Sequence, residues 1–425
     1  MGLLIILGLG GLIRNSRVRG FVITIYYLLF TENFGSKAPS FEDGFYGIIV
    51  SMKTYKFKLY RHKRNKYLHY SINASASIYN HCIALHKRYY KMFGKHLNQY
   101  RLMKHIAKLR KRIRYWQQVG SQAVQDIVQR IEKAYKLFFK QHKCGTRPPG
   151  FKKRRKYKSF TLKQAGYKFI SDNKIKIGKH IFKFSLSRII QGKIKTLTVK
   201  RNNLGELFIL VVTDHQDETI PNMTGKIAGW DFGLKIFLTG SDGTTIESPL
   251  FFKQLRNKLK AASRSLSRKK KGSKGWYKAK DHLNRIHEEI TNKRHDWFWK
   301  LSHQLTDQYD VLIFEDLNLK GMQRLWGRKI SDLAFATFLE ILQTVAEFKG
   351  KTVHFIDRFY PSSKTCSHCG HINQELILKD RFWDCENCDT KKIPRDWNAS
   401  VNICRVGAST LKLDTVRPSK MASVV

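Results

Sequence analysis

Four cysteines and one acid near the end of the chain have the types and spacing needed for metal chemistry. Cys366 and Cys369 form one Cys-x2-Cys pair, and after fifteen residues Cys385 and Cys388 form a second. This is the spacing of a four-thiolate zinc site. Such a site is closed, so we expect structural Zn²⁺ rather than catalytic Zn²⁺. Eight residues after the last cysteine the chain places Asp396.

Two further carboxylates end short apolar runs that we expect to be strands. Asp231 lies in Gly-Trp-Asp-Phe-Gly, and Glu315 follows Val-Leu-Ile-Phe. A carboxylate at the end of a buried strand is costly unless it is paired or holds a metal. Together with Asp396, these acids would form a cage for two Mg²⁺ ions, or for Mn²⁺, that could cleave phosphodiester bonds. Each acid alone also has a structural interpretation: Asp231 as a turn former, Glu315 as a strand-end ion pair and Asp396 as a helix N-cap.

The charge of the chain predicts a polyanionic partner. Eighty Lys and Arg residues face 32 Asp and Glu residues, which gives a formal net charge of +48. Such a field attracts nucleic acid and drives binding through counterion release. An anionic membrane is the competing partner, but aromatic residues interleaved with the basic ones favour base stacking. We therefore expect nucleic acid and no membrane, and the cysteine spacing favours a reducing compartment such as a prokaryotic cytoplasm.

The first 51 residues differ from the rest of the chain. Their two apolar runs are shorter than the roughly 18 residues that a spanning helix needs. Residues 1–51 also carry little of the positive charge. Met52 begins a segment that alternates like a strand. Our hypothesis is that Met52 is the true start and that residues 1–51 are a non-native leader.

Hydrophobic periodicity divides the remainder into several predicted parts. We expect a β domain at 52–60 and 147–222, and a helical domain at 61–146. In the latter, apolar residues spaced by three and four lie between many basic ones, which indicates a nucleic-acid-binding bundle. From residue 223 strands and helices alternate, which is typical of an α/β layer. The predicted ranges of this second half are 223–363 and 392–406 for the α/β domain, 364–391 for the zinc ribbon and 407–425 for a flexible tail.

Five motifs in this order resemble the TnpB (OrfB) family of transposon-encoded proteins. They are Gly-Trp-Asp-Phe-Gly, Phe-Glu-Asp-Leu-Asn-Leu-Lys-Gly-Met, Pro-Ser-Ser-Lys-Thr, the two cysteine pairs, and Arg-Asp-Trp-Asn-Ala-Ser-Val-Asn-Ile. The resemblance covers about residues 52–405. It implies a RuvC-like, RNase H-fold α/β nuclease domain with an inserted zinc ribbon, an N-terminal helical bundle and a small β-barrel-like domain.

The family resemblance also implies an activity and partners. The expected function is RNA-guided cleavage of target DNA, with a guide RNA from the transposon end and with Asp231, Glu315 and Asp396 as the catalytic metal ligands. Two positions depart from the family pattern: Pro394 replaces a frequent acid, and Trp230 replaces an aliphatic residue. Neither removes a catalytic carboxylate. The alternatives are a transposase that performs strand transfer and a non-catalytic zinc-ribbon DNA-binding protein; the oligomeric state stays open.

Overall fold

A computed structural model describes residues 52–215, 222–377 and 379–413 of the chain. The predicted leader and residues 414–425 of the predicted tail lie outside this part. No helix within the described ranges is long and apolar enough to cross a membrane.

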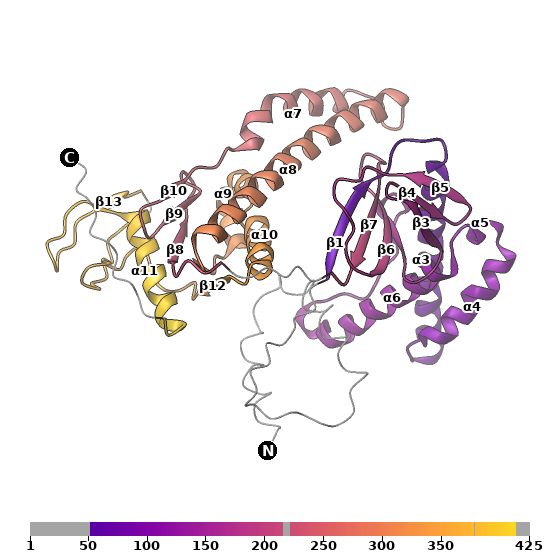
Figure 1. Cartoon of the computed structure of the whole chain (residues 1–425), viewed down its shortest axis with the longest axis horizontal. Coiled ribbons are helices and arrows are strands. Elements are labelled where there is room, and N and C mark those ends of the chain that lie inside the picture. Colours follow the sequence, from indigo (N-terminus) through magenta and orange to yellow (C-terminus); the bar gives the residue numbers. More distant parts are fainter. Residues whose placement is uncertain (1–51, 216–221, 378, 414–425) are drawn as a thin grey trace, which may run out of the picture. The chain divides into compact units, whose positions relative to one another are not determined.

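The N-terminal half begins with a strand and continues into a group of helices (Figure 1). In the helical domain the apolar residues spaced by three and four run from Leu102 to Trp116, a pattern that predicts one continuous helix. The helix is interrupted, because Ile113 adopts an extended conformation with φ −93° and ψ 101°. Leu102 and Ile106 are nevertheless buried, as the pattern predicted. The helices are α3 (Asn65–Phe93), α4 (Gln99–Arg112), α5 (Arg114–Gln117) and α6 (Ser121–Gln141), followed by the short 3-10 turns His142–Cys144 and Arg154–Lys156.

The strands of the N-terminal half form two antiparallel sheets. The four-stranded sheet has the order β1-β7-β6-β2, so the first strand of the described chain pairs with a strand about 150 residues later. The second sheet has the order β3-β4-β5, and one bridge between Leu59 and Phe184 connects the two. The small β-barrel-like domain that we expected stays a prediction, although these antiparallel strands do lie in the predicted β ranges. The strands are β1 (Lys53–Lys58), β2 (Ser159–Leu162), β3 (Tyr167–Ser171), β4 (Lys174–Ile177), β5 (His180–Lys183), β6 (Ile194–Arg201) and β7 (Leu207–Thr213).

The C-terminal half contains a mixed five-stranded sheet of order β10-β9-β8-β11-β12. The first three strands pair antiparallel, whereas β8, β11 and β12 run parallel. This mixed sheet agrees with the predicted α/β layer. Its strands are β8 (Ile227–Phe232), β9 (Leu238–Gly240), β10 (Thr245–Ile246), β11 (Val311–Glu315) and β12 (Thr352–Ile356).

Helices cover both faces of this sheet. On one face α8 and α10 bury Trp230 and Phe314 in an aromatic core. On the other face α11 packs its Ile403 and Ala408 against Ile313. The helices are α7 (Phe251–Ser267), α8 (Lys274–Gln308), α9 (Leu319–Leu333), α10 (Phe335–Phe348) and α11 (Arg395–Thr410), and a small hairpin of β13 (Phe382–Trp383) and β14 (Ile393–Pro394) precedes α11.

Two glycines allow α11 to approach the sheet closely. A Cβ atom on Gly229 of β8 would overlap the backbone of Ser400 and Cys404, and one on Gly407 would overlap the side chain of Ile313. Residues 407–410, expected in the flexible tail, are therefore the last turn of α11 and not loose chain. The end of the helix stays in place because Gly407 is packed against β11.

The contact at Gly229 predicts a stability effect. Gly229→Ala should lower the free energy of unfolding by roughly 3 kcal/mol or more, because overpacking against backbone leaves no side chain that could move aside. Chemical denaturation measures the loss. Gly150→Ala is the matched control, since a Cβ atom there meets nothing within 4 Å. Equal stability of the two variants would contradict the close approach of α11.

Candidate active site and metal centre

Two of the predicted catalytic acids end neighbouring parallel strands. Trp230 of β8 pairs with Phe314 of β11, and Asp231 and Glu315 are the next residues on each strand. Because side chains alternate between the faces of a sheet, the acids point away from the side that buries Trp230 and Phe314. They therefore face the side that α11 covers.

The third acid comes from the first turn of α11. Asp396 is the second residue of this helix, after the extended residue Pro394 at its N-cap. It is not the N-cap itself, so that structural interpretation of Asp396 is wrong. Its carboxylate accepts hydrogen bonds from Arg381 at 3.2 and 3.4 Å. Arg381 belongs to the segment between the two cysteine pairs, so this segment contributes the positive charge that neutralises Asp396.

Electrostatic interaction links the three acids. The pKa of Asp231 is raised to about 7, first by burial and then by the negative charges of Asp396 and Glu315. Burial also raises the pKa of Glu315, while a hydrogen bond from Ser362 opposes that shift. Asp231 thus lies close enough to Asp396 and Glu315 for their negative charges to disfavour its ionised form.

The acids do not, however, form a compact cage for a single ion. Within the described residues, the four cysteines are the one group of three or more His, Cys, Asp or Glu side chains with that geometry. The paired-ion site therefore stays a prediction.

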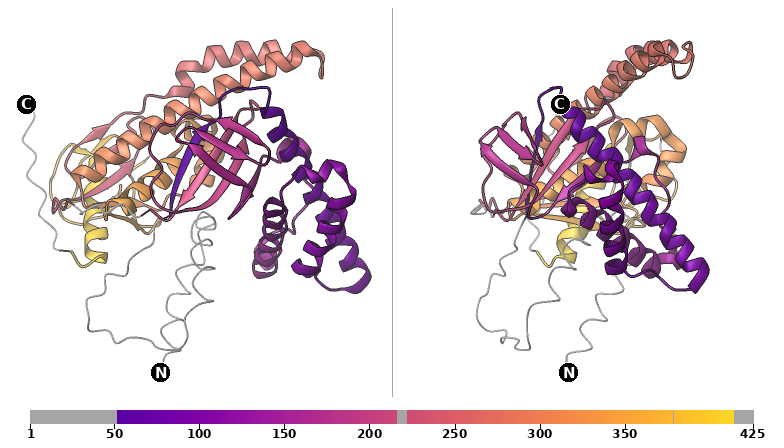
Figure 2. Two further views of the ribbon diagram at one scale, coloured as in Figure 1. Left: turned by 45° about the vertical axis from the view of Figure 1, so that its right-hand side comes forward. Right: turned by 90° about the vertical axis from the view of Figure 1, so that its right-hand side faces the viewer.

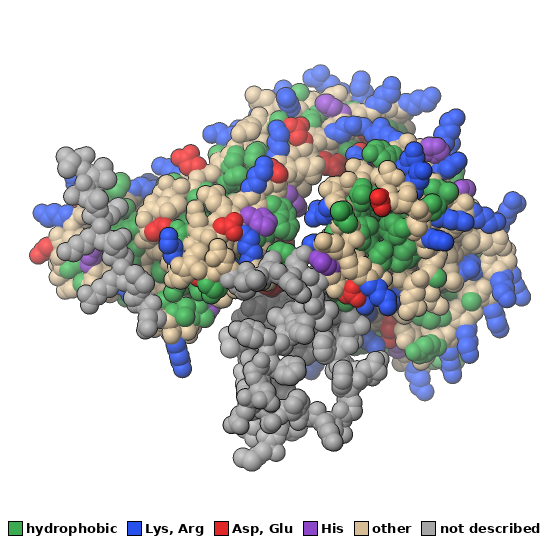
Figure 3. Space-filling model, viewed as in Figure 1, with side chains coloured by type: hydrophobic (Ala, Val, Ile, Leu, Met, Phe, Trp, Pro, Cys, Tyr) green, Lys and Arg blue, Asp and Glu red, His purple; other side chains and the backbone are tan. Residues whose placement is uncertain are grey.

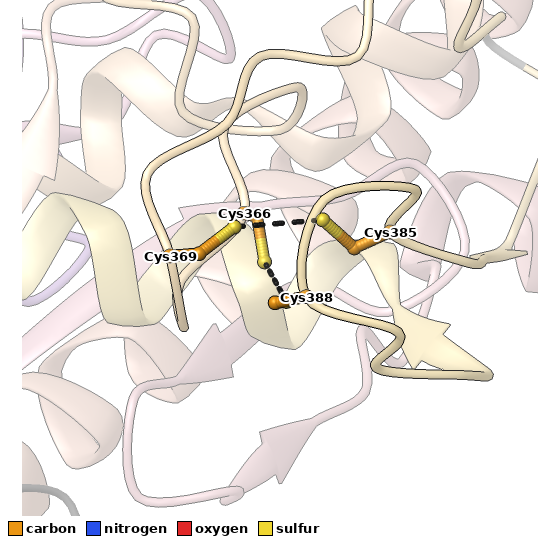
Figure 4. A group of neighbouring side chains, drawn as sticks. All are labelled: Cys366, Cys369, Cys385 and Cys388. Carbon is orange, nitrogen blue, oxygen red and sulfur yellow. Dashed lines mark hydrogen bonds between the residues drawn. The ribbon is translucent and has the colours of Figure 1, made fainter.

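The four cysteine thiols converge as their spacing predicts (Figure 4). Their sulfur atoms all lie within 4.8 Å of one another. The Sγ atoms of Cys366 and Cys388 are 3.7 Å apart, and those of Cys369 and Cys385 are 3.6 Å apart. Zn–S bonds of about 2.3 Å in a tetrahedron place sulfur atoms roughly 3.8 Å apart, so the thiols fit a tetrahedral metal.

Hydrogen bonds around the thiols favour deprotonation of one of them. The side chain of Asn387 and the backbone amide of His371 lower the pKa of Cys369 to about 6. Burial instead raises the pKa of Cys366. A cation in the centre would favour the thiolate form of all four ligands.

Two asparagines fix the cysteine-bearing segment to α11. Asn398 donates to the Thr365 carbonyl at 2.7 Å and accepts from the Ser367 amide at 2.8 Å. Asn402, one turn later, donates to the carbonyls of Ser362 and Thr365 at 2.9 and 2.6 Å. Both asparagines are almost fully buried. They join the Pro-Ser-Ser-Lys-Thr motif to the motif that carries Asp396.

Ser362 connects these asparagine hydrogen bonds to the acids. Its hydroxyl group donates to Glu315 at 3.4 Å, while its carbonyl is held by Asn402. Our prediction from the residues assigned no role to Ser362, Asn398, Asn402 or Arg381. The one signal that could have revealed two of them is the spacing of Asn398 and Asn402, which places both asparagines on the same face of the helix.

The two departures from the family pattern affect other parts of the fold. Trp230 is fully buried in the aromatic core, edge-on to Tyr309 with ring centroids 5.5 Å apart. Its side chain lies on the face opposite Asp231. Pro394 pairs with Phe382 in the small hairpin and is the N-cap residue that precedes α11. Neither residue displaces an acid.

Comparison with known proteins gives matches to two families over this half of the chain. Residues 210–325 match the OrfB_IS605 family, described as "Probable transposase". Residues 335–403 match the "Cas12f1-like, TNB domain". The resemblance to the TnpB/OrfB family is confirmed. All seven predicted site residues lie inside the two matched ranges.

Curated relatives carry names of the same kind. A Streptomyces pristinaespiralis protein named "Putative RNA-guided DNA endonuclease" is 33% identical over 231 residues, which cover 54% of this chain and 57% of the relative. The Escherichia coli K12 protein "Putative RNA-guided DNA endonuclease InsQ" is 27% identical over 68% of this chain and 75% of its own length. The chain thus spans little more than half of the first relative.

Solved structures add weaker likenesses. A Cas12f1-sgRNA-target DNA complex shares 17% identity, with a TM-score of 0.31, over 83% of this chain and 99% of its own chain. A CRISPR-Cas12f ternary complex shares 16% identity, with a TM-score of 0.32, over 81% of this chain and 82% of its own chain. TM-scores of this size support no conclusion about the arrangement of this chain.

The raised pKa of Asp231 predicts a pH-dependent stability. Because the pKa in the folded chain exceeds the ordinary value of 3.8, folding favours the neutral acid. The resulting destabilisation is absent below about pH 4 and complete above about pH 7. In buffer free of Mg²⁺, Asp231→Asn should exceed the wild type in unfolding free energy at pH 8, by roughly 4 kcal/mol at most, because Asp231 retains some solvent exposure. The two proteins should converge near pH 4.

Denaturation at a series of pH values measures this difference. Asp316→Asn is the control, because Asp316 is half-exposed and paired with Arg358. If the stability advantage of Asp231→Asn over the wild type were no larger at pH 8 than at pH 4, the pKa of Asp231 would not be raised.

Proposed function

We propose that this chain is an RNA-guided DNA endonuclease whose catalytic acids are Asp231, Glu315 and Asp396. The observation that carries the proposal is the placement of Asp231 beside Glu315 at the ends of β8 and β11, with its pKa raised first by burial and then by the charges of Asp396 and Glu315. The sheet order and the placement of the acids support an RNase H-like domain. The names of the curated relatives support guided cleavage of DNA.

The acids would hold two Mg²⁺ ions, or Mn²⁺. When bound, such ions supply an activated water and neutralise the leaving oxygen of a phosphodiester. The chain's own residues prepare this site. The hydrogen bond from Ser362 would orient the carboxylate of Glu315, and Arg381 would neutralise Asp396 as long as this carboxylate holds no metal.

The four cysteines would hold structural Zn²⁺. They belong to a small apolar cluster that includes Trp383 and Ile393, immediately before α11. A closed thiolate site performs no chemistry, but it folds the segment that precedes Asp396. Zinc would therefore support activity by placing the third acid and its partner Arg381.

The basic N-terminal half would bind guide RNA and DNA. No Asp or Glu occurs between residues 52 and 125, whereas α3 and α4 carry many Lys and Arg residues. A surface of this kind binds phosphate backbones without reading sequence. The origin of the guide RNA from the transposon end remains part of the proposal.

Strand transfer by a transposase is the second candidate, because one family description names a transposase. The same acids could serve either reaction. A requirement for RNA distinguishes them: guided cleavage needs it, whereas joining of transposon ends does not. Retention of DNA binding without cleavage by any guide would instead identify a binding protein.

Substitution of each acid tests the catalytic proposal. With a co-expressed guide RNA, Mg²⁺ and a matching plasmid, Asp231→Ala, Glu315→Ala and Asp396→Ala should each reduce cleavage at least about 100-fold. Loss of a residue that only supports a ligand already costs about 10- to 100-fold, and Ser362→Ala should fall in that range. Gel-based plasmid cleavage measures the rates.

Asp316→Asn is the control for these substitutions, since it removes a neighbouring acid that is exposed and ion-paired. It should cleave at the wild-type rate. Cleavage that survives in Asp231→Ala would contradict the assignment of the acids.

Metal content tests the cysteine site. Native mass spectrometry should find one Zn²⁺ in the wild-type chain and none in Cys385→Ser, because three thiolates leave the tetrahedron open. Cys144→Ser is the control, since this exposed cysteine lies outside the cluster. Full Zn²⁺ content in Cys385→Ser would exclude the four-thiolate site.

A further inference from the structure

A long helical hairpin extends from the α/β half of the chain. Helices α7 and α8 run side by side in both views of Figure 2. Leu255 and Ala262 of α7 pack against Ile286 and Ile290 of α8, so the hairpin has a small apolar core of its own. Phe251, Phe252, Leu259 and Leu283 are partly buried against this core.

The tip of the hairpin lies well beyond the main core. Only the C-terminal part of α8 joins the sheet, through Phe298, Leu301 and Leu305. Lys274, the first residue of α8, precedes Phe298 by 24 residues. At 1.5 Å per residue, the tip extends roughly 36 Å from that anchor.

This hairpin carries positive charge without any acid in its outer part. Between residues 251 and 280 there are twelve Lys and Arg residues and no Asp or Glu. Lys269, Lys270 and Lys271, in the turn between the helices, are exposed. Figure 3 shows Lys and Arg side chains gathered along the edge formed by α7 and α8.

In the inner part of α8, by contrast, lysines are paired with acids on the same helix, as is usual on a solvated helix surface. There Lys293 pairs with Glu289 at 2.9 Å, and Lys300 pairs with Asp296 at 2.8 Å, each one turn away. The outer part has no such acids, so its cations repel one another. That repulsion is relieved when a polyanion binds.

Two aromatic rings accompany these cations. Tyr277 is 55% exposed, and Trp276 contacts it edge-on with centroids 5.1 Å apart. The ammonium group of Lys280 lies over the Trp276 ring at 5.1 Å. One face of Trp276 is thus occupied by a cation, whereas Tyr277 is open to solvent. An exposed ring beside lysines suits an unpaired nucleobase, because bases in a duplex are already stacked.

We propose that the tip of this hairpin, residues 268–280, binds single-stranded DNA, with the lysines on phosphates and Tyr277 stacked on a base. The choice of DNA rests on the proposed function, since the hairpin belongs to the same half as the acids that would cut DNA. The tip would hold a strand several nucleotides away from those acids.

A binding measurement under conditions that do not allow cleavage tests this assignment. Fluorescence anisotropy of a labelled single-stranded oligodeoxynucleotide is measured over a range of salt concentrations, without Mg²⁺ or guide. The triple variant Lys269→Ala, Lys270→Ala, Lys271→Ala should reduce the salt-dependence slope by about 2, since each lost phosphate contact contributes about 0.7. The control, Lys293→Ala, Lys300→Ala, Lys349→Ala, removes the same charge from residues that are ion-paired. It should change the slope much less.

Substitution of the ring tests stacking. Tyr277→Leu should weaken binding of the single strand about 5- to 100-fold, and Tyr277→Phe should restore it. Binding of a duplex should not depend on this ring. Thermal melting confirms that each variant is folded.

Three results would overturn the proposal. They are equal slopes for the two triple variants, wild-type affinity in Tyr277→Leu, and tighter hairpin-dependent binding of RNA of the same sequence. A chain that fails to cleave but shows the expected binding losses would refute the proposed nuclease and leave the DNA-binding hairpin in place.

Discussion

Helix α11 lies against the central sheet because Gly229 has no side chain. At this point of β8 the backbone of the helix takes the space that a Cβ atom would fill. At Gly407 of the helix, the side chain of Ile313 from β11 takes that space. Asp231 and Glu315 follow these contacts on their strands, and Asp396 lies at the start of the helix. The distance between helix and sheet therefore determines how near the third acid comes to the other two.

The polar network around α11 completes this arrangement. Asn398 and Asn402 are buried and use their amide groups to hold the backbone of residues 362–367. Buried amides are stable only when they are hydrogen-bonded, so the helix and this segment stabilise each other. The hydroxyl group of Ser362 donates to Glu315, and the guanidinium group of Arg381 donates to Asp396. In the proposed function, the cysteine cluster would support the acids without taking part in their chemistry.

Much of this arrangement could be predicted from the sequence, for identifiable reasons. The apolar run Val311–Phe314 and the spacing of the cysteines each imply one local structure, and both were confirmed. The break at Ile113 and the helical turn at 407–410 could not be predicted, because tertiary contacts decide where those helices end. The roles of Ser362 and Arg381 depend on contacts across 47 and 15 residues, which no local pattern shows.

The central claim is that packing of α11 brings three acids together to hold divalent cations. A crystal soaked in Mn²⁺ tests it most directly, because anomalous scattering locates the ion. The account predicts anomalous density among Asp231, Glu315 and Asp396, with Asp396 released from Arg381. Absence of density there, in crystals whose cysteine cluster contains zinc, would contradict it.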